Sequence, residues 1–140
     1  MRKNTALLLL AVTPLEACAK VDFEGCLARL PGTWEAEGRG RGALRLGPNG
    51  EASAWNLRLG NVDESMLSIE GEGRWSRPVE GANDAKQFGS TASFRVDLKD
   101  DHGNPTSVSL YLDCAGSEPT VVDWAGNPQT RRSRTFRRRR

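Results

Sequence analysis

The chain has 140 residues, of which 37% are hydrophobic and 27% charged, and this composition predicts one folded domain. Its net charge of +2 is unevenly distributed: residues 131–140 hold seven arginines, whereas residues 18–130 hold 11 basic and 17 acidic side chains. The predicted domain is therefore acidic. This argues against a nucleic-acid-binding face on it and against nucleic acid as a partner.

The first residues are typical of an export signal. Arg2 and Lys3 precede an apolar stretch from Ala6 to Leu15. This stretch is too short to span a bilayer as a helix, which takes about 20 residues, but it suits the hydrophobic part of a signal peptide. We expect residues 1–17 to be the signal peptide, and no later apolar run approaches membrane-spanning length.

Two cleavage sites fit the residues that follow. Leu15-Glu16-Ala17-Cys18 resembles the bacterial lipobox, in which the cysteine is lipidated and becomes the new N-terminus, although Glu16 is unusual at its position. Ala17-Cys18-Ala19 also satisfies the small-residue rule for ordinary signal cleavage, here before Lys20. The first site predicts a lipoprotein anchored to the cell membrane through Cys18. The second predicts a secreted protein, and an uncleaved N-terminus is the third interpretation.

Export leaves two cysteines for the folded domain, because Cys18 is either acylated or removed. Cys26 and Cys114 then face an oxidising compartment, where a disulfide between them is the simplest outcome. The alternative is two independent buried thiols.

Residues 18–31 are expected to form an N-terminal tether and a short helix. Asp22 can cap the helix N-terminus, and Pro31-Gly32 ends it. A helix this short is unstable alone, so we expect it to pack on the rest of the domain. Its apolar residues at helical spacing are Phe23, Cys26, Leu27 and Leu30.

From Gly32 onward, apolar and polar residues alternate with period two, which predicts short β-strands. The turn at residues 47–50 contains Asn-Gly, a strong hairpin signal. Trp55 is expected to face outward and Leu57 is out of phase, while residues 58–69 are ambiguous and residues 77–89 form the longest loop. The predicted strands cover residues 32–37, 42–46, 51–57, 71–76, 90–98, 106–114, 119–124 and 132–137.

These strands predict an all-β domain over residues 32–137. We expect a single antiparallel seven- or eight-stranded lipocalin-like barrel with a short N-terminal helix, followed by a basic tail at residues 138–140. Closure of the sheet into a barrel removes the exposed edges that an open sheet of this size would leave, and folding it into a sandwich is the alternative that hides them. Several inward residues are small, so the interior is expected to be incompletely filled.

Gly32-Thr33-Trp34 follows the predicted helix and resembles the calycin signature of lipocalins and fatty-acid-binding barrels, in which the tryptophan plugs the closed end of the barrel. A longer series of blocks resembles a group of uncharacterised actinobacterial lipoproteins. The sequence departs from that group at Ala52, where an aromatic residue is expected, and at Asp123, an acid in an apolar strand. The resemblance implies a fold and a location but no chemistry. Its blocks are residues 30–34, 44–50, 54–57, 71–75, 119–122, 126–128 and 134–137.

No residue pattern predicts catalysis or a cofactor. His102 is the only histidine and lies in a predicted turn, so a hydrolase would need a second buried polar group near it. Glu70 and Glu72 are typical of an exposed strand rather than of glycoside hydrolysis. Four oxygen-bearing residues around the turn lack the spacing of a calcium loop, so no metal site is predicted. They are Asp97, Asp100, Asp101 and Asn104.

The leading hypothesis is an exported, membrane-anchored, monomeric and non-enzymatic barrel that holds a small apolar ligand. The alternative is a cell-envelope interaction module, or an inhibitor of an extracellular enzyme, that acts through a loop such as residues 77–89. The arginines at the end of the sequence either bind anionic lipid headgroups or wall polymers, or form a solvated segment. The predicted ligand-binding residues are Trp34, Ala52, Ala54, Phe94, Val96 and Leu110.

Overall fold

The computed structural model describes residues 21–37, 42–57, 68–115, 118–125 and 132–140. The predicted signal peptide, the predicted lipidation site Cys18, nearly all of the ambiguous segment 58–69 and the predicted turn at residues 126–128 lie outside these ranges.

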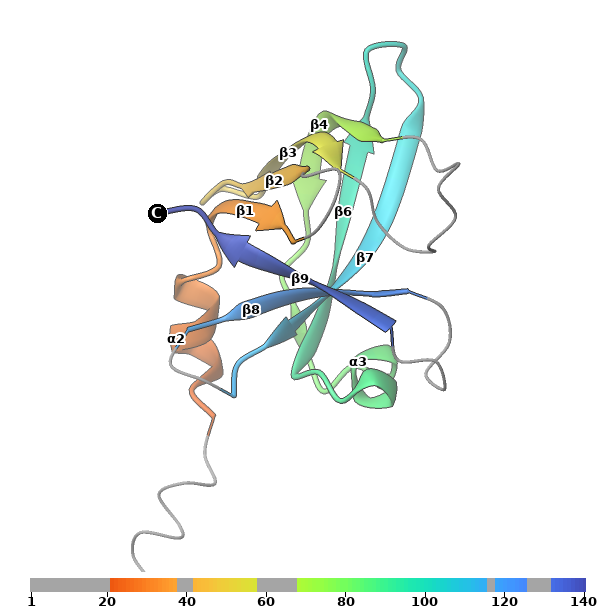
Figure 1. The fold of residues 1–140 in the computed structure, drawn as a ribbon. Helices are drawn as coiled ribbons and strands as arrows, with labels where there is room; N and C mark the ends of the chain where they lie inside the picture. Colours follow the sequence, from red (N-terminus) through yellow and green to blue (C-terminus); the bar gives the residue numbers. More distant parts are fainter. Residues whose placement is uncertain (1–20, 38–41, 58–67, 116–117, 126–131) are drawn as a thin grey trace, which may run out of the picture.

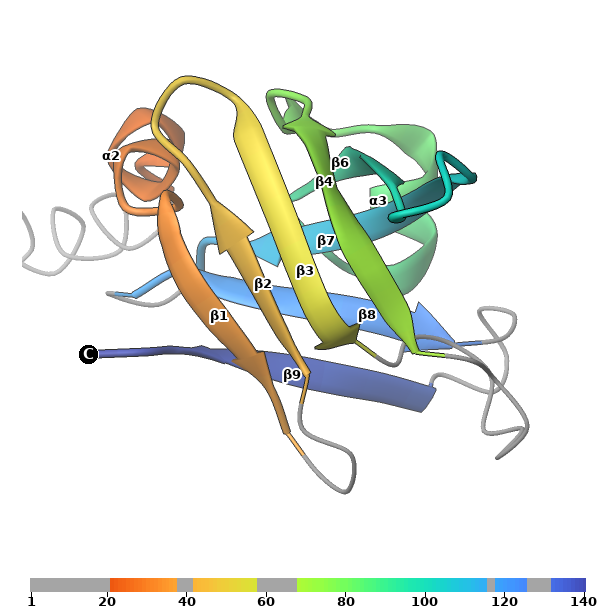
Figure 2. The same cartoon turned by 90° about the horizontal axis from the view of Figure 1, so that it is seen from above.

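The predicted all-β fold is confirmed. Antiparallel strands form a sheet in the order β4-β3-β2-β1-β9-β8-β7-β6, and pairing of β4 with β6 closes it into an eight-stranded barrel (Figure 1). Seen from above, β1 to β4 cross in front of β7, β8 and β9 (Figure 2). A ninth, two-residue strand, β5, pairs with β6 beside β4. The strands are β1 Gly32–Ala36, β2 Ala43–Leu46, β3 Glu51–Leu57, β4 Ile69–Trp75, β5 Val79–Glu80, β6 Ala92–Lys99, β7 Pro105–Asp113, β8 Thr120–Ala125 and β9 Arg132–Arg138.

The short helix α2, Phe23–Ala28, precedes the barrel as expected. The Asp22 carboxylate accepts a hydrogen bond from the Gly25 N–H at 3.0 Å, which satisfies one of the unpaired donors at the helix start. Cys26 is buried and belongs to the barrel core, and the half-buried Phe23 packs against the same core. The helix therefore derives its stability from packing on the barrel.

Alternation along the strands decides which side chains fill the barrel. On β6, the inward residues Ala92, Phe94, Val96 and Leu98 are at most 3% exposed. Leu57 restores the inward phase of β3, because Asn56 adopts a left-handed backbone conformation (φ 50°) and the register with β4 shifts there. The phase break seen in the sequence is thus a β-bulge, and it buries Leu57 completely.

Two glycines permit the pairing that closes the barrel. A Cβ atom on Gly73 of β4 would lie 1.8 Å from the backbone oxygen of Asp97 on β6, and a Cβ atom on Gly71 would lie 2.2 Å from that of Lys99. Neither approach is compatible with a larger residue unless the two strands separate. Close contact between β4 and β6 therefore depends on these glycines.

The prediction that residues 77–89 form a loop is wrong. This segment contains β5 and a second helix, α3, Asn83–Phe88. The helix covers the outer face of the barrel, where Ala85 is fully buried against Tyr111 and Val122. The ring of Phe88 lies 5.3 Å from that of Tyr111. This packing makes the segment an ordered part of the barrel wall rather than a free exposed loop.

The last strand extends one residue into the predicted basic tail. β9 ends at Arg138, and the backbone N–H of Arg139 donates to the Thr33 carbonyl at 2.8 Å. β9 pairs with β1, so residues at the two ends of the described chain lie side by side.

Candidate functional site

Trp34, which the sequence singled out, is buried in the barrel core. Its side chain is 1% exposed, and its indole Nε1 donates to the Leu30 carbonyl at 2.9 Å. The guanidinium carbon of Arg138 lies 5.9 Å from the Trp34 ring centroid, which is within cation–π range. Arg138 also donates to the carbonyls of Arg29 and Pro31, the latter at 2.7 Å. These contacts join the last strand to the segment that links α2 to β1.

Sequence analysis missed this role of Arg138. The alternation along the last strand could have predicted it. Phe136 faces inward, and period-two alternation places Arg138 on the same face of β9. The residue was instead assigned to a basic tail, and so its two carbonyl partners were not anticipated.

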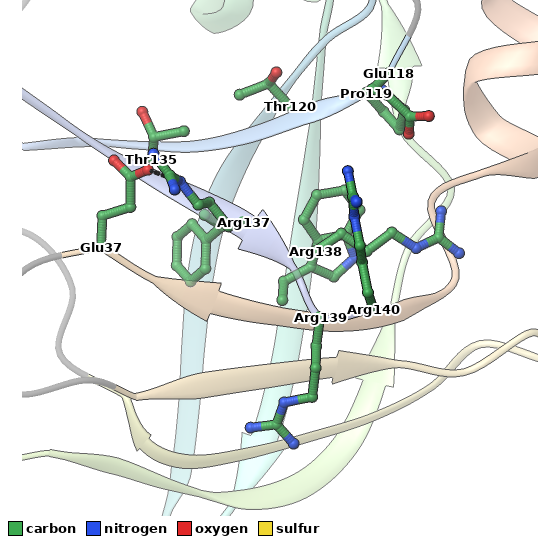
Figure 3. Close-up of a pocket in the computed structure, with 11 residues that line it drawn as sticks. Glu37, Glu118, Pro119, Thr120, Thr135, Arg137, Arg138, Arg139 and Arg140 are labelled. Carbon is green, nitrogen blue, oxygen red and sulfur yellow. Dashed lines mark hydrogen bonds and ion pairs between the residues drawn. The ribbon is translucent and has the colours of Figure 1, made fainter.

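A groove of about 700 Å³ is open to solvent and is lined mainly by β9 and the residues that follow it (Figure 3). Four consecutive arginines and two glutamates supply its charged side chains, which gives the lining a positive balance. Trp34 and Phe136 supply its aromatic surface. The remaining lining residues are Glu37, Glu118, Pro119, Thr120, Thr135, Arg137, Arg138, Arg139 and Arg140.

The four arginines differ in how their charge is compensated. Arg137 donates to the Glu37 carboxylate at 2.5 Å. Arg139 donates to the Glu35 carboxylate at 2.6 Å, and its guanidinium lies 5.8 Å from the exposed ring of Trp55. Within the described part of the chain, the hydrogen bonds of Arg138 go to carbonyls, and no carboxylate lies within ion-pairing distance of Arg138 or Arg140. The groove therefore keeps positive charge that its own side chains do not neutralise.

A second groove of about 460 Å³ lies between α2 and the turn after β2. Its lining is largely apolar and includes Leu27 of α2 and Trp75 at the end of β4. The Trp75 indole donates to the Gly47 carbonyl at 2.9 Å, which fixes the ring in place. Arg77 crosses this groove to Glu24, an exposed ion pair of 2.8 Å.

The predicted partners Cys26 and Cys114 lie at disulfide distance. Their sulfur atoms are 2.06 Å apart and their Cα atoms 5.9 Å apart, well within the range a disulfide needs. The bridge fastens α2 to the residue that follows β7. Residues 88 positions apart in the sequence are thereby joined.

The structure brings the six predicted ligand-binding residues together in the barrel interior. Each is at most 5% exposed, and all belong to one continuous core cluster. They come from β1, β3, β6 and β7. Whether this interior takes a ligand stays a prediction.

The carboxylates around His102 organise a turn. Asp100 accepts hydrogen bonds from the backbone N–H groups of His102 and Asn104, at 2.9 and 2.8 Å. The Asn104 N–H bond is the main cause that holds the pKa of Asp100 below its ordinary value. These contacts explain the aspartate as a turn residue. Within the described ranges, no group of three His, Cys, Asp or Glu residues is placed to hold a metal ion.

Asp97 and Tyr111 have shifted pKa values for different reasons. Asp97 accepts a hydrogen bond from the Ser107 hydroxyl at 2.5 Å and another from Arg95 at 3.1 Å, and both lower its pKa. Burial beneath α3 raises the pKa of Tyr111, with smaller contributions from Asp84 and Asp123. Asp97 lies on the outer surface of β6, and Tyr111 belongs to the packing of α3. Neither geometry resembles a catalytic site.

The helices in the described part of the chain are all too short or too polar to cross a membrane. Comparison with protein-family models, curated proteins and solved structures found no match for this chain.

Proposed function

We propose that this protein is an exported, non-enzymatic barrel that acts through its surface as an interaction module of the cell envelope. The observation that carries the proposal is the burial of the large side chains in the barrel interior. The side chains that line it form one cluster in which Trp34, Phe94 and Phe136 are at most 3% exposed. Large leucines, including Leu44 and Leu110, are fully buried among them. The two grooves described above are open to solvent.

Anchoring through Cys18 is part of the proposal. It is supported by the lipobox-like residues before Cys18 and by the resemblance to actinobacterial lipoproteins. Helix α2 begins only five residues later, at Phe23, which would hold the barrel close to the membrane. Stable anchoring takes more than one acyl chain, so di- or triacylation is expected.

The anchor is tested by cell fractionation. Wild-type protein should remain with the membrane, and the variant Cys18→Ser should lose its lipid while the fold is unchanged. Soluble wild-type protein whose first residue is Lys20 would contradict the anchor.

A small apolar ligand inside the barrel is the second candidate function. It is favoured by small side chains among the interior residues, which include Ala52, Ala54 and Ala92. On β4, Gly71 and Gly73 pair with Ala54 and Ala52. This region carries little side-chain volume and is where a ligand would sit.

The substitution Ala54→Phe separates the two candidates. If the interior is packed, overpacking should cost about 1–3 kcal/mol in the free energy of unfolding, measured by urea denaturation. Ser53→Phe is the matched control, because it places the same ring on the outer face of the same strand. If the interior holds a ligand, Ala54→Phe should be tolerated and should abolish ligand uptake.

Native mass spectrometry of protein purified from its own host provides the second test. The surface-module proposal predicts the mass of the processed chain alone. An additional apolar molecule that is released on unfolding, together with tolerance of Ala54→Phe, would overturn it in favour of ligand binding.

A further inference from the structure

We propose that the end of the barrel that carries α2 and Arg137–Arg140 lies against an anionic membrane surface, with the arginines contacting lipid phosphates. The inference rests on the proposed anchor at Cys18, and it adds an orientation and a lipid preference. Its evidence comes from the placement of the tether, the distribution of charge and the open groove.

Helix α2 and the last arginine lie at the same side of the molecule. Two views related by a quarter turn both place α2 and Arg140 on the left, and both place the hairpin between β6 and β7 away from them (Figures 1 and 2). Arg138 contacts the carbonyl of Arg29, the residue that caps the C-terminus of α2. Arg138 therefore lies close to the helix that follows the proposed anchor, and the last arginine lies on the same side of the molecule.

The tether is short enough to keep these arginines near the membrane. Phe23 is five positions after Cys18, and even a fully extended chain of that length spans only about 17 Å. Helix α2 adds about 9 Å for its six residues. The barrel can tilt within this reach and bring its basic end within the Debye length of about 8 Å at physiological salt.

Charge favours one orientation of the barrel. The part of the chain from residue 18 to residue 130 has 17 acidic and 11 basic side chains, so an anionic surface repels most of the domain. Residues 137–140 are exposed arginines, so the local charge at this end is positive. Such an arrangement turns the basic end toward an anionic membrane and the acidic remainder away from it.

The groove supplies hydrogen-bond donors as well as charge. Arg138 and Arg140 line it without an ion-pairing carboxylate in the described part of the chain, and the hydroxyls of Thr120 and Thr135 lie in the same lining. A phosphate group accepts bonds from both guanidinium and hydroxyl donors. A lipid phosphate that enters the groove would thus accept hydrogen bonds in addition to being attracted by charge.

Vesicle sedimentation of the full chain tests the inference. Binding is measured to vesicles of phosphatidylcholine alone and to vesicles with 30% phosphatidylglycerol, at low and high salt. The test variant is Arg137→Gln/Arg140→Gln. The matched control is Arg95→Gln/Lys99→Gln on β6, which also removes one ion-paired arginine and one further cation. Melting temperatures of both variants are compared with wild type to establish that the fold is kept.

We expect wild type to bind the anionic vesicles more tightly, with the excess lost at high salt. Each arginine near the surface should raise the affinity for anionic vesicles about fivefold. The excess affinity of the test variant for anionic over neutral vesicles should therefore be about 25-fold lower than that of wild type. The control should stay within about twofold of wild type. Equal losses in the two variants, or no excess for anionic vesicles, would overturn the inference.

The same experiment distinguishes this inference from the anchor and from a polymer partner. Binding to neutral vesicles reports the membrane anchor, whereas the anionic excess reports the arginines. Soluble polyphosphate is added in a separate arm. If it binds in a manner that depends on Arg137 and Arg140 while no anionic excess is found, the groove serves an acidic polymer and the membrane inference is wrong.

Discussion

Removal of the disulfide should destabilise the barrel substantially. The double variant Cys26→Ala/Cys114→Ala opens a loop that joins residues 88 positions apart. The chain-entropy relation gives about 4.6 kcal/mol for a loop of that length, and measured values are often lower. The total stability of a domain is about 5–15 kcal/mol, so the bridge would account for a large share of it.

Urea denaturation followed by tryptophan fluorescence measures this effect. We expect the free energy of unfolding of the double variant to fall by about 2–4.6 kcal/mol. Wild type treated with a reductant should match the variant, and the reductant should leave the variant itself unchanged. The slope of the unfolding free energy against urea concentration reports whether the unfolded chain has become more expanded.

Two outcomes would refute this reasoning. One is a double variant within about 0.5 kcal/mol of wild type, the range typical of surface substitutions away from special features. The other is an intact mass showing two free thiols in the exported protein. Either result would mean that α2 is held on the barrel without a stabilising disulfide.

Three further substitutions test the closure of the barrel and its surface electrostatics. Gly73→Ala should lower the free energy of unfolding by about 1–3 kcal/mol or more, because its Cβ would lie 1.8 Å from a backbone oxygen. Gly103→Ala is the control, since its Cβ meets nothing within 4 Å and the substitution causes only backbone strain. Ser107→Ala should raise the pKa of Asp97 toward its ordinary value of 3.8, as followed by carboxyl NMR, because the hydroxyl bond is its main stabiliser. Because the pKa of Asp97 is lower in the folded state than in the unfolded state, its carboxylate stabilises the fold at pH values above the unfolded-state pKa. This contribution is lost as the pH falls through the folded-state pKa. The stability of the variant should therefore differ from that of wild type above about pH 4 and converge with it in stronger acid. Arg138→Met should lower the melting temperature, since two carbonyl hydrogen bonds are lost.

The strands could be predicted because their local pattern matches their environment. On β6 and β7, apolar residues at every second position face the core, and the paired registers keep that phase over eight residue pairs. Cys114 could be placed inward by the same alternation. Helical spacing placed Cys26 inward, so the pairing of the two thiols was accessible from the sequence.

Helix α3 could not be predicted, because its stability is not local. Its N-cap residue, Ala82, makes no side-chain capping bond, and Ala85 is the only residue of this helix that is buried in the structure. Pro78 and Gly81 just before it are typical of a loop. The contacts that hold it come from Tyr111 and Val122, which are distant in sequence.

The charge of the candidate groove was only partly predictable. The run of arginines is obvious in the sequence, but its neutralisation depends on which glutamates lie opposite. Glu35 and Glu37 reach Arg139 and Arg137 because β1 pairs with β9 in one particular register. That register is set when the barrel closes and joins strands about a hundred residues apart in the sequence. No local sequence pattern specifies it.

Pairing of the first strand with the last also constrains when the protein can fold. Glu35 and Arg137 are register partners more than a hundred residues apart, and β1 has no other neighbour to take the place of β9. During synthesis, early strands can form hairpins, but the barrel stays open until residues 132–139 have left the ribosome. Contacts of such long sequence separation also make folding slow. Completion of the core therefore waits until β9 is available to pair with β1, and until then the earlier strands form an open sheet at most.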